Sequence, residues 1–127
     1  MYEDIFRKRI FAVAGASRHP SKFGSIVYRF LREAGYEVYA VNPNADRLED
    51  DRCYDTVLDL PEKPDVVVTV TQPWVTSTVL GQCLAMGIPV VWMQPGSEPR
   101  QGIVEAQSAG VKVVRACIMV EHSQLRS

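Results

Sequence analysis

The chain has few of the residues from which metal sites and disulfide frameworks are built. Its 127 residues include three cysteines and two histidines, and no two cysteines form a C-x-x-C pair. Structural zinc sites usually need four such ligands at short spacings, so a zinc site is not expected. The cysteines (Cys53, Cys83 and Cys117) are widely spaced and odd in number. Free thiols in a reducing compartment are therefore the simplest interpretation.

Long apolar runs and an excess of basic charge are also missing. No run approaches the roughly 20 apolar residues that a membrane span requires. Residues 1–9 carry charges where a signal peptide would have its apolar core. The formal net charge of −1 offers no broad basic surface for nucleic acid. These absences predict a cytoplasmic protein that binds neither nucleic acid nor a membrane.

The chain does contain a regular alternation of strand-like and helix-like segments. Apolar side chains at 23, 26, 27, 30, 31 and 34, for example, form one stripe of a helix that Gly35 ends. The predicted strands cover 9–14, 37–41, 66–70, 88–93 and 111–114, and the predicted helices cover 23–34, 74–86 and 97–109. A short helix or arm is predicted over 1–9, a solvated loop over 45–51, a short extended piece at 53–54 and a helical turn over 56–60.

This alternation favours an α/β fold, because strands that alternate with helices usually form a parallel sheet. Crossover connections in such sheets are right-handed. We therefore expect a doubly wound five-stranded parallel sheet flanked by helices, in a single domain over residues 1–127. Four loops should leave the carboxyl edge of this sheet, at residues 15–22, 42–44, 71–73 and 94–97. Ligands of doubly wound sheets bind at that edge.

The first of these loops has the features of an anion site. Gly15-Ala16-Ser17 lies between a buried strand and the start of a helix, where unpaired backbone N–H groups and the positive end of the helix dipole meet. The loop also carries Arg18, His19 and Lys22. The pattern predicts a site for a phosphate group of a nucleotide-like ligand. A tight turn without a ligand is the alternative.

Two common nucleotide motifs are absent. A dinucleotide site requires G-x-G-x-x-G in the first loop and an acidic residue after the second strand. The first loop lacks the second glycine, and the second strand ends in Val41-Asn42-Pro43. No G-K-[ST] follows Gly15, which excludes a P-loop. The cationic loop instead fits a ligand with more phosphate charge than a single pyrophosphate.

Several of these pieces, in this order, resemble the CoA-binding domain family of small Rossmann-like proteins. They are Gly15-Ala16-Ser17 with Pro20, Lys22 and Gly24, then Val41-Asn42-Pro43, Cys53-Tyr54, Pro64-Asp65-Val66-Val67 and the segment 117–122. The resemblance extends from about Arg9 to His122. The expected fold is similar to that of the CoA-binding domain of the α subunit of succinyl-CoA synthetases. The resemblance implies a Rossmann-like fold that binds coenzyme A or an acyl-CoA.

The resemblance also implies which residues would face the ligand. Gly15, Ala16, Ser17 and Lys22 would face the phosphates. Val41, Asn42 and Pro43 would flank the ligand at the end of the second strand, and Thr71, Gln72, Pro73 and Gln94 would line the rest of the cleft. Phe23 and Trp74 are candidates to contact the adenine or the pantetheine, with a place in the core as their alternative. An exposed lysine without a ligand is the alternative for Lys22.

No catalytic constellation stands out in the sequence. A nucleophile needs a base within hydrogen-bond reach, and Cys117 would meet His122 only if the C-terminal segment folded back. The leading hypothesis is therefore a CoA-binding module without catalysis of its own, which acts as a homo-oligomer or on a partner enzyme. The alternatives are an acyl-CoA enzyme that uses Cys117 and a small NAD(P)- or nucleotide-dependent enzyme.

Overall fold

The computed structural model describes residues 1–45, 47–48 and 51–125. These described residues include seven strands: β1 (Ile10–Ala14), β2 (Glu37–Val41), β3 (Arg47–Leu48), β4 (Asp51–Tyr54), β5 (Val66–Thr69), β6 (Val90–Met93) and β7 (Lys112–Arg115). The helices are α1 (Glu3–Phe6), α2 (Phe23–Glu33), α3 (Pro73–Met86), α4 (Ile103–Ser108) and α5 (Ile118–Gln124), with a 3-10 turn η1 (Val57–Asp59). The alternation predicted from the sequence is confirmed, and its five strands are all present.

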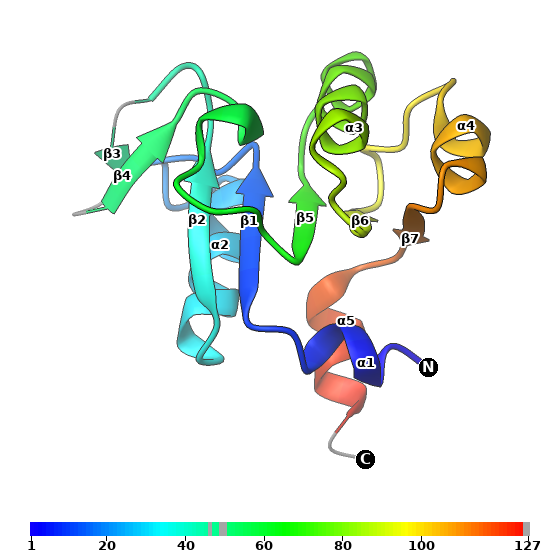
Figure 1. The fold of residues 1–127 in the computed structure, drawn as a ribbon. Coiled ribbons are helices and arrows are strands. Elements are labelled where there is room, and N and C mark those ends of the chain that lie inside the picture. The colour runs from blue at the N-terminus through cyan, green and yellow to red at the C-terminus, as the bar shows by residue number, and fades with distance from the viewer. Residues whose placement is uncertain (46, 49–50, 126–127) are drawn as a thin grey trace.

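The strands form one sheet in the order β3-β4-β2-β1-β5-β6-β7 (Figure 1). Every neighbouring pair is parallel except β3 with β4. The chain proceeds outward from β1 through β2 to β4, returns to β5 beside β1, and then proceeds outward the other way. The strand order therefore reverses between β1 and β5, and this is the position at which doubly wound sheets bind ligands.

Both faces of the sheet are covered, and alternate residues of β1 supply the two cores. Phe11 and Val13 pack with the side chains of α1, α2 and α5. Ala12 and Ala14 pack with those of η1, α3 and α4. All five residues of β1 are buried, as expected for a central parallel strand covered by helices on both sides.

The predicted solvated loop over 45–51 was wrong in part. Residues 47–48 and 51–54 form the antiparallel pair β3 and β4, and Leu48 is buried. Asp51 accepts a hydrogen bond from the Tyr28 hydroxyl (2.9 Å) and pairs with Arg32, so an acidic residue here attaches β4 to α2. Positions 46, 49 and 50 of this prediction lie outside the described residues.

The predicted helix over 97–109 is also shorter than expected. Ser97 does not open a helix, because its hydroxyl is buried and donates to the Gln94 carbonyl (2.8 Å). The Glu98 carboxylate accepts from the Gly96 N–H (2.8 Å), which keeps this segment a folded loop. The helix α4 begins only after Gly102, whose φ of 102° is a conformation that other residues rarely adopt.

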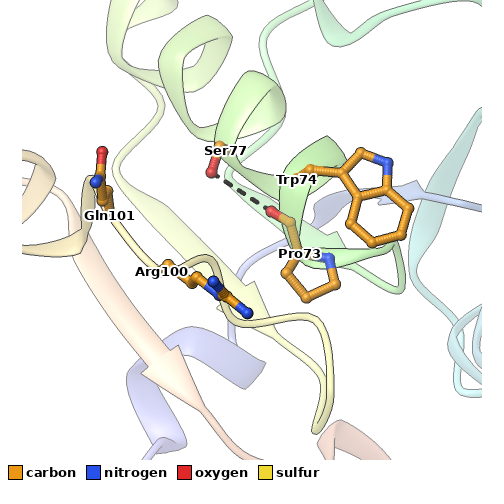
Figure 2. Close-up of a pocket in the computed structure, with 5 residues that line it drawn as sticks. All are labelled: Pro73, Trp74, Ser77, Arg100 and Gln101. Carbon is orange, nitrogen blue, oxygen red and sulfur yellow. Dashed lines mark hydrogen bonds between the residues drawn. The ribbon is translucent and has the colours of Figure 1, made fainter.

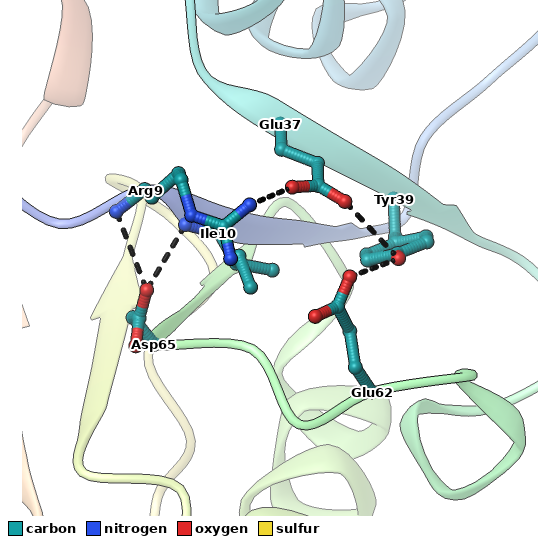
Figure 3. Close-up of polar contacts among 6 residues, drawn as sticks. All are labelled: Arg9, Ile10, Glu37, Tyr39, Glu62 and Asp65. Carbon is teal, nitrogen blue, oxygen red and sulfur yellow. Dashed lines mark hydrogen bonds and ion pairs between the residues drawn. The ribbon is translucent and has the colours of Figure 1, made fainter.

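A cluster of polar side chains connects neighbouring strands at the amino edge of the sheet, opposite the predicted ligand edge (Figure 3). The Asp65 carboxylate accepts from the N–H groups of Ile10 (3.0 Å) and Arg9 (3.3 Å), which ties the start of β5 to the start of β1. The Tyr39 hydroxyl donates to Glu62 (2.6 Å), and this bond is the main reason why the pKa of Tyr39 is raised. These contacts give Asp65 a structural role.

Cys83 supplies a test of the packing beneath α3. Its side chain is fully buried, and burial raises the pKa of the thiol from 9.0 to about 12. We expect iodoacetamide at pH 8 to leave Cys83 unmodified in the folded protein and to modify it in urea, as read by peptide mass spectrometry. The folded state holds the Cys83 proton more tightly than the unfolded state. The contribution of the buried thiol to the free energy of unfolding is therefore complete below pH 9 and is lost as the pH rises toward 12. Rapid labelling of folded Cys83 would contradict this packing.

Candidate functional site

The turn between β1 and α2 is built from two glycines in contact. Gly15 has a φ of 96°, and its N–H donates to the Val41 carbonyl (2.9 Å). A Cβ added to Gly24, in the first turn of α2, would lie 2.0 Å from the Gly15 carbonyl oxygen. Only a residue without a side chain lets the helix approach the strand end this closely. The start of α2 is thereby held against the end of β1.

The end of β5 lies equally close to this turn. A Cβ on Gly15 would be 3.0 Å from the Val70 carbonyl oxygen and 3.1 Å from the Thr71 methyl group. The Thr71 hydroxyl is 2.6 Å from the hydroxyl of Thr76, which is buried in the first turns of α3. The loops at residues 15–22 and 71–73 therefore meet at the reversal of strand order, as the sequence predicts.

Asn42 joins the loop after β2 to the same turn. Its side-chain N–H donates to the Ala16 carbonyl (2.8 Å), and its side-chain oxygen accepts from the Asn44 N–H (2.9 Å). The Asn42 side chain therefore holds the first loop in place, whereas the adjacent Pro43 is exposed and Val41 is buried at the end of β2. In this arrangement Asn42 acts as a positioning residue.

The start of α2 has the electrostatic character predicted for an anion site. Lys22 is the N-cap residue and makes no side-chain capping bond, so the first N–H groups of this 11-residue helix have no partner within the helix. Ser17 bonds locally, since its hydroxyl accepts from the His19 N–H (3.1 Å). The side chains of Arg18, His19 and Lys22 are exposed around the turn. The positive charge of the first loop is thus available to a ligand.

A pocket of about 470 Å³ continues from the end of β5. It is lined by Pro73, Trp74, Ser77, Arg100 and Gln101 (Figure 2). Gln72 is exposed and is the N-cap residue of α3, and Pro73 is the first residue of that helix. Of the residues predicted at 71–73 to line a cleft, Pro73 borders this pocket. Sequence reasoning missed Arg100 and Gln101, because residues 97–109 read as a helix.

The two candidate aromatic residues lie outside the core. Trp74 is 70% exposed and Phe23 is 39% exposed. Their alternative interpretation, as helix-start residues that pack in the core, does not apply in this structure. Both stand at the first turn of a helix that begins at the ligand edge of the sheet, where they remain candidates for contact with the adenine or the pantetheine.

Gln94 has a different place from the one expected. It was predicted to line the cleft, but its side chain is fully buried. The side-chain oxygen accepts from the Ile118 N–H (2.7 Å) at the start of α5, and the amide N–H lies 3.7 Å from the Cys117 sulfur. Gln94 thus accepts a hydrogen bond from the first backbone N–H of α5, a helix that was not predicted from the sequence. Gln94 was predicted to line the cleft because it is a polar residue directly after a buried strand. In the structure its side chain caps the start of α5.

Cys117 and His122 belong to opposite ends of α5. Cys117 is half-buried at the start of the helix beneath Gln94. The His122 ring packs edge-on against Phe6 (5.2 Å between ring centroids) and Phe30 (5.4 Å). Figure 1 shows α5 running from β7 toward α1 and away from the ligand edge. The geometry therefore offers no support for a Cys117–His122 pair in the cleft.

The described residues also bear on metal binding and membrane insertion. In residues 1–45, 47–48 and 51–125, no group of three or more histidine, cysteine, aspartate or glutamate side chains could hold a metal ion. Within the same part of the chain, no helix has both the length and the apolar character needed to cross a membrane.

The doubly wound sheet, the glycine turn and the cationic helix start together define a Rossmann-like α/β protein with a candidate ligand site at its carboxyl edge. Within this class the chain belongs to the CoA binding domain family, whose model matches residues 9–123. The resemblance drawn from the sequence is confirmed.

Relatives with this domain include both small proteins and large ligases. The chain is 30% identical over 128 residues to the α subunit of the ADP-forming acetate–CoA ligase I of Pyrococcus furiosus, covering 88% of this chain and 28% of that subunit. It is 33% identical over 87 residues to the ADP-forming acetate–CoA ligase II of Archaeoglobus fulgidus, covering 67% of this chain and 13% of the ligase. The chain thus spans less than a third of these two relatives.

A solved structure of similar size is that of a hypothetical protein from Pyrococcus horikoshii OT3. The two share 36% identity with a TM-score of 0.92, and the match covers 98% of this chain and 89% of the other. The Rossmann-like fold is confirmed by this likeness. The sheet has two strands more than the five that were predicted, β3 and β4.

Proposed function

We propose that residues 1–127 form one domain that binds coenzyme A or an acyl-CoA at the carboxyl edge of the sheet. The phosphates lie at the turn formed by Gly15, Ala16 and Ser17 and at the start of α2, with Lys22 as their nearest cation. The observation that carries the proposal is the uncapped start of α2, held against Gly15 and surrounded by exposed cations. Anions bind favourably at such helix starts.

The rest of the ligand extends to both sides of this turn. One part lies against Val41 and Pro43 at the end of β2, and the other runs past Thr71, Gln72 and Pro73 toward the pocket beside α3. Membership of the CoA binding domain family supports coenzyme A over other nucleotides. The end of β2 carries Asn42 where a dinucleotide site has an acidic residue, which disfavours NAD.

The domain acts by binding, without a catalytic group of its own, and it serves a partner enzyme or works as a homo-oligomer. The relatives named as acetate–CoA ligases support the first alternative, because they contain a matching segment within a much longer chain. The three cysteines are free thiols. This fits the reducing cytoplasm that the sequence predicts as the location of the protein.

Thermal unfolding with added ligands tests the proposal. We expect CoA and acetyl-CoA to raise the melting temperature, because a ligand that binds only the folded state stabilises it by mass action. NAD, NADP and FAD are the comparison ligands, and they should have no effect at equal concentration. A shift with NAD and none with CoA would overturn the assignment. Calorimetric titration would then give the affinity and stoichiometry.

A further inference from the structure

The pocket beside α3 combines an apolar wall with one unpaired cation. Its surface is mostly apolar, and Pro73 lies between Trp74 and Arg100 (Figure 2). The Arg100 side chain reaches from the loop after β6 toward Pro73, and the Trp74 indole lies on the other side of that proline (Figure 2). Within residues 1–45, 47–48 and 51–125, no hydrogen bond or ion pair engages the Arg100 guanidinium.

The order of the strands relates this pocket to the proposed CoA site. The ends of β2, β1, β5 and β6 lie side by side in that order. Neighbouring strands are about 4.8 Å apart, so about 14 Å separates the end of β2 from the end of β6. A ligand with its phosphates at β1 and one end at β2 directs its other end past β5 to the loop that carries Arg100. Pro73 belongs both to that path and to the pocket.

The character of the pocket selects which end of the ligand enters it. An apolar wall suits a pantetheine arm and the methylene groups of an acyl chain. A guanidinium at the far side suits a carboxylate, which it binds through two parallel hydrogen bonds. The Ser77 hydroxyl is already engaged with the Pro73 carbonyl (3.4 Å), which leaves Arg100 as the charged recognition group.

We infer that this pocket binds the acyl group of an acyl-CoA whose far end carries a second carboxylate, with Arg100 as the residue that recognises the carboxylate. The inference rests on the proposed CoA binding and adds the class of acyl group. Arg100 is a specificity residue, and it makes no contact with the CoA portion itself. Acyl groups that end in a methyl group fill the apolar part of the pocket and leave the guanidinium unpaired.

Titration calorimetry with matched thioesters tests the inference. The probes are CoA, pentanoyl-CoA and glutaryl-CoA, which has a carboxylate in place of the terminal methyl group of pentanoyl-CoA. We expect the wild-type protein to bind glutaryl-CoA about tenfold more tightly than pentanoyl-CoA. Arg100→Gln should remove this preference and leave the affinities for CoA and pentanoyl-CoA unchanged. Arg100→Lys should keep part of it.

The control is Arg7→Gln, because Arg7 is exposed and precedes β1 at the opposite edge of the sheet. It should retain the full preference for glutaryl-CoA. Equal wild-type affinities for the two thioesters would overturn the inference and leave the proposed CoA binding standing. An equal loss of affinity in Arg100→Gln for CoA and both thioesters would also overturn the inference, because Arg100 would then contact the CoA portion that all three share. If the wild-type protein binds none of the three, the proposed function itself fails.

Discussion

Replacing Gly24 by alanine is expected to lower the free energy of unfolding by about 3 kcal/mol or more, within the upper range for overpacked sites. The added Cβ would stand 2.0 Å from the Gly15 carbonyl oxygen and 2.9 Å from its carbonyl carbon. Both are backbone atoms of a turn that is itself close to Val70 and Thr71, so the turn cannot yield without moving its neighbours. Urea unfolding followed by circular dichroism measures the change.

Gly81→Ala is the matched control, because Gly81 is also a helical glycine and a Cβ there would meet nothing within 4 Å. Alanine in the exposed middle of α3 should stabilise the protein by about 0.5–1 kcal/mol. We also expect the folded fraction of Gly24→Ala to bind CoA more weakly than wild type, because the added Cβ displaces the turn that forms the proposed anion site. Equal stability of Gly24→Ala and wild type would contradict the close contact of α2 with β1.

Removing the charge of Lys22 should weaken CoA binding by about tenfold or more, because a charge-assisted hydrogen bond to phosphate contributes about 1.5–3 kcal/mol. Lys22 is exposed and precedes the first helical residue of α2, so Lys22→Ala removes the cation and leaves the packing unchanged. Lys22→Glu should weaken binding further, because it places a negative charge at the helix start. Calorimetry at two salt concentrations measures both effects, and the loss should shrink as salt screens the charge.

Lys8→Ala serves as the control for Lys22. Lys8 is likewise exposed, but it precedes β1 at the amino edge of the sheet, so its loss should leave CoA affinity unchanged. If Lys22→Ala and Lys8→Ala bind CoA as the wild type does, Lys22 is an ordinary solvated lysine, and the phosphates must be held by backbone N–H groups and the remaining cations of the first loop.

Elements with a strong internal pattern were predictable from the sequence. The apolar stripe from Phe23 to Leu31 and the β-branched run from Val66 to Thr69 each determine their own structure, and both segments appear where predicted. The extended piece predicted at 53–54 is confirmed as the end of β4, but the pairing of β4 with β3 was not predictable, because most side chains of the two strands are polar and only Leu48 and Cys53 are buried. These two strands form because β4 pairs with β2 and β3 pairs with β4, and neither pairing is visible in the local sequence.

The candidate site divides in the same way. The glycine turn and the cations of the first loop are local, and the sequence indicated both. The hydrogen bonds of Asn42 and Gln94 join them to distant backbone groups, at Ala16 and Ile118, so these two contacts could not be predicted from the local sequence. Arg100 lines the pocket beside α3 from a loop where the sequence predicted a helix, and the buried Ser97 hydroxyl bonds to Gln94 within that loop.

The two outer strands of the sheet determine how copies of this chain can associate. Among the described residues β3 comprises two, and β7 has the exposed charged side chains of Lys112 and Arg115 at its ends. Short or charged edge strands resist pairing with the edge of another sheet. A continuous sheet running across two molecules is therefore disfavoured. A homo-oligomer is therefore expected to associate through surfaces other than the two sheet edges.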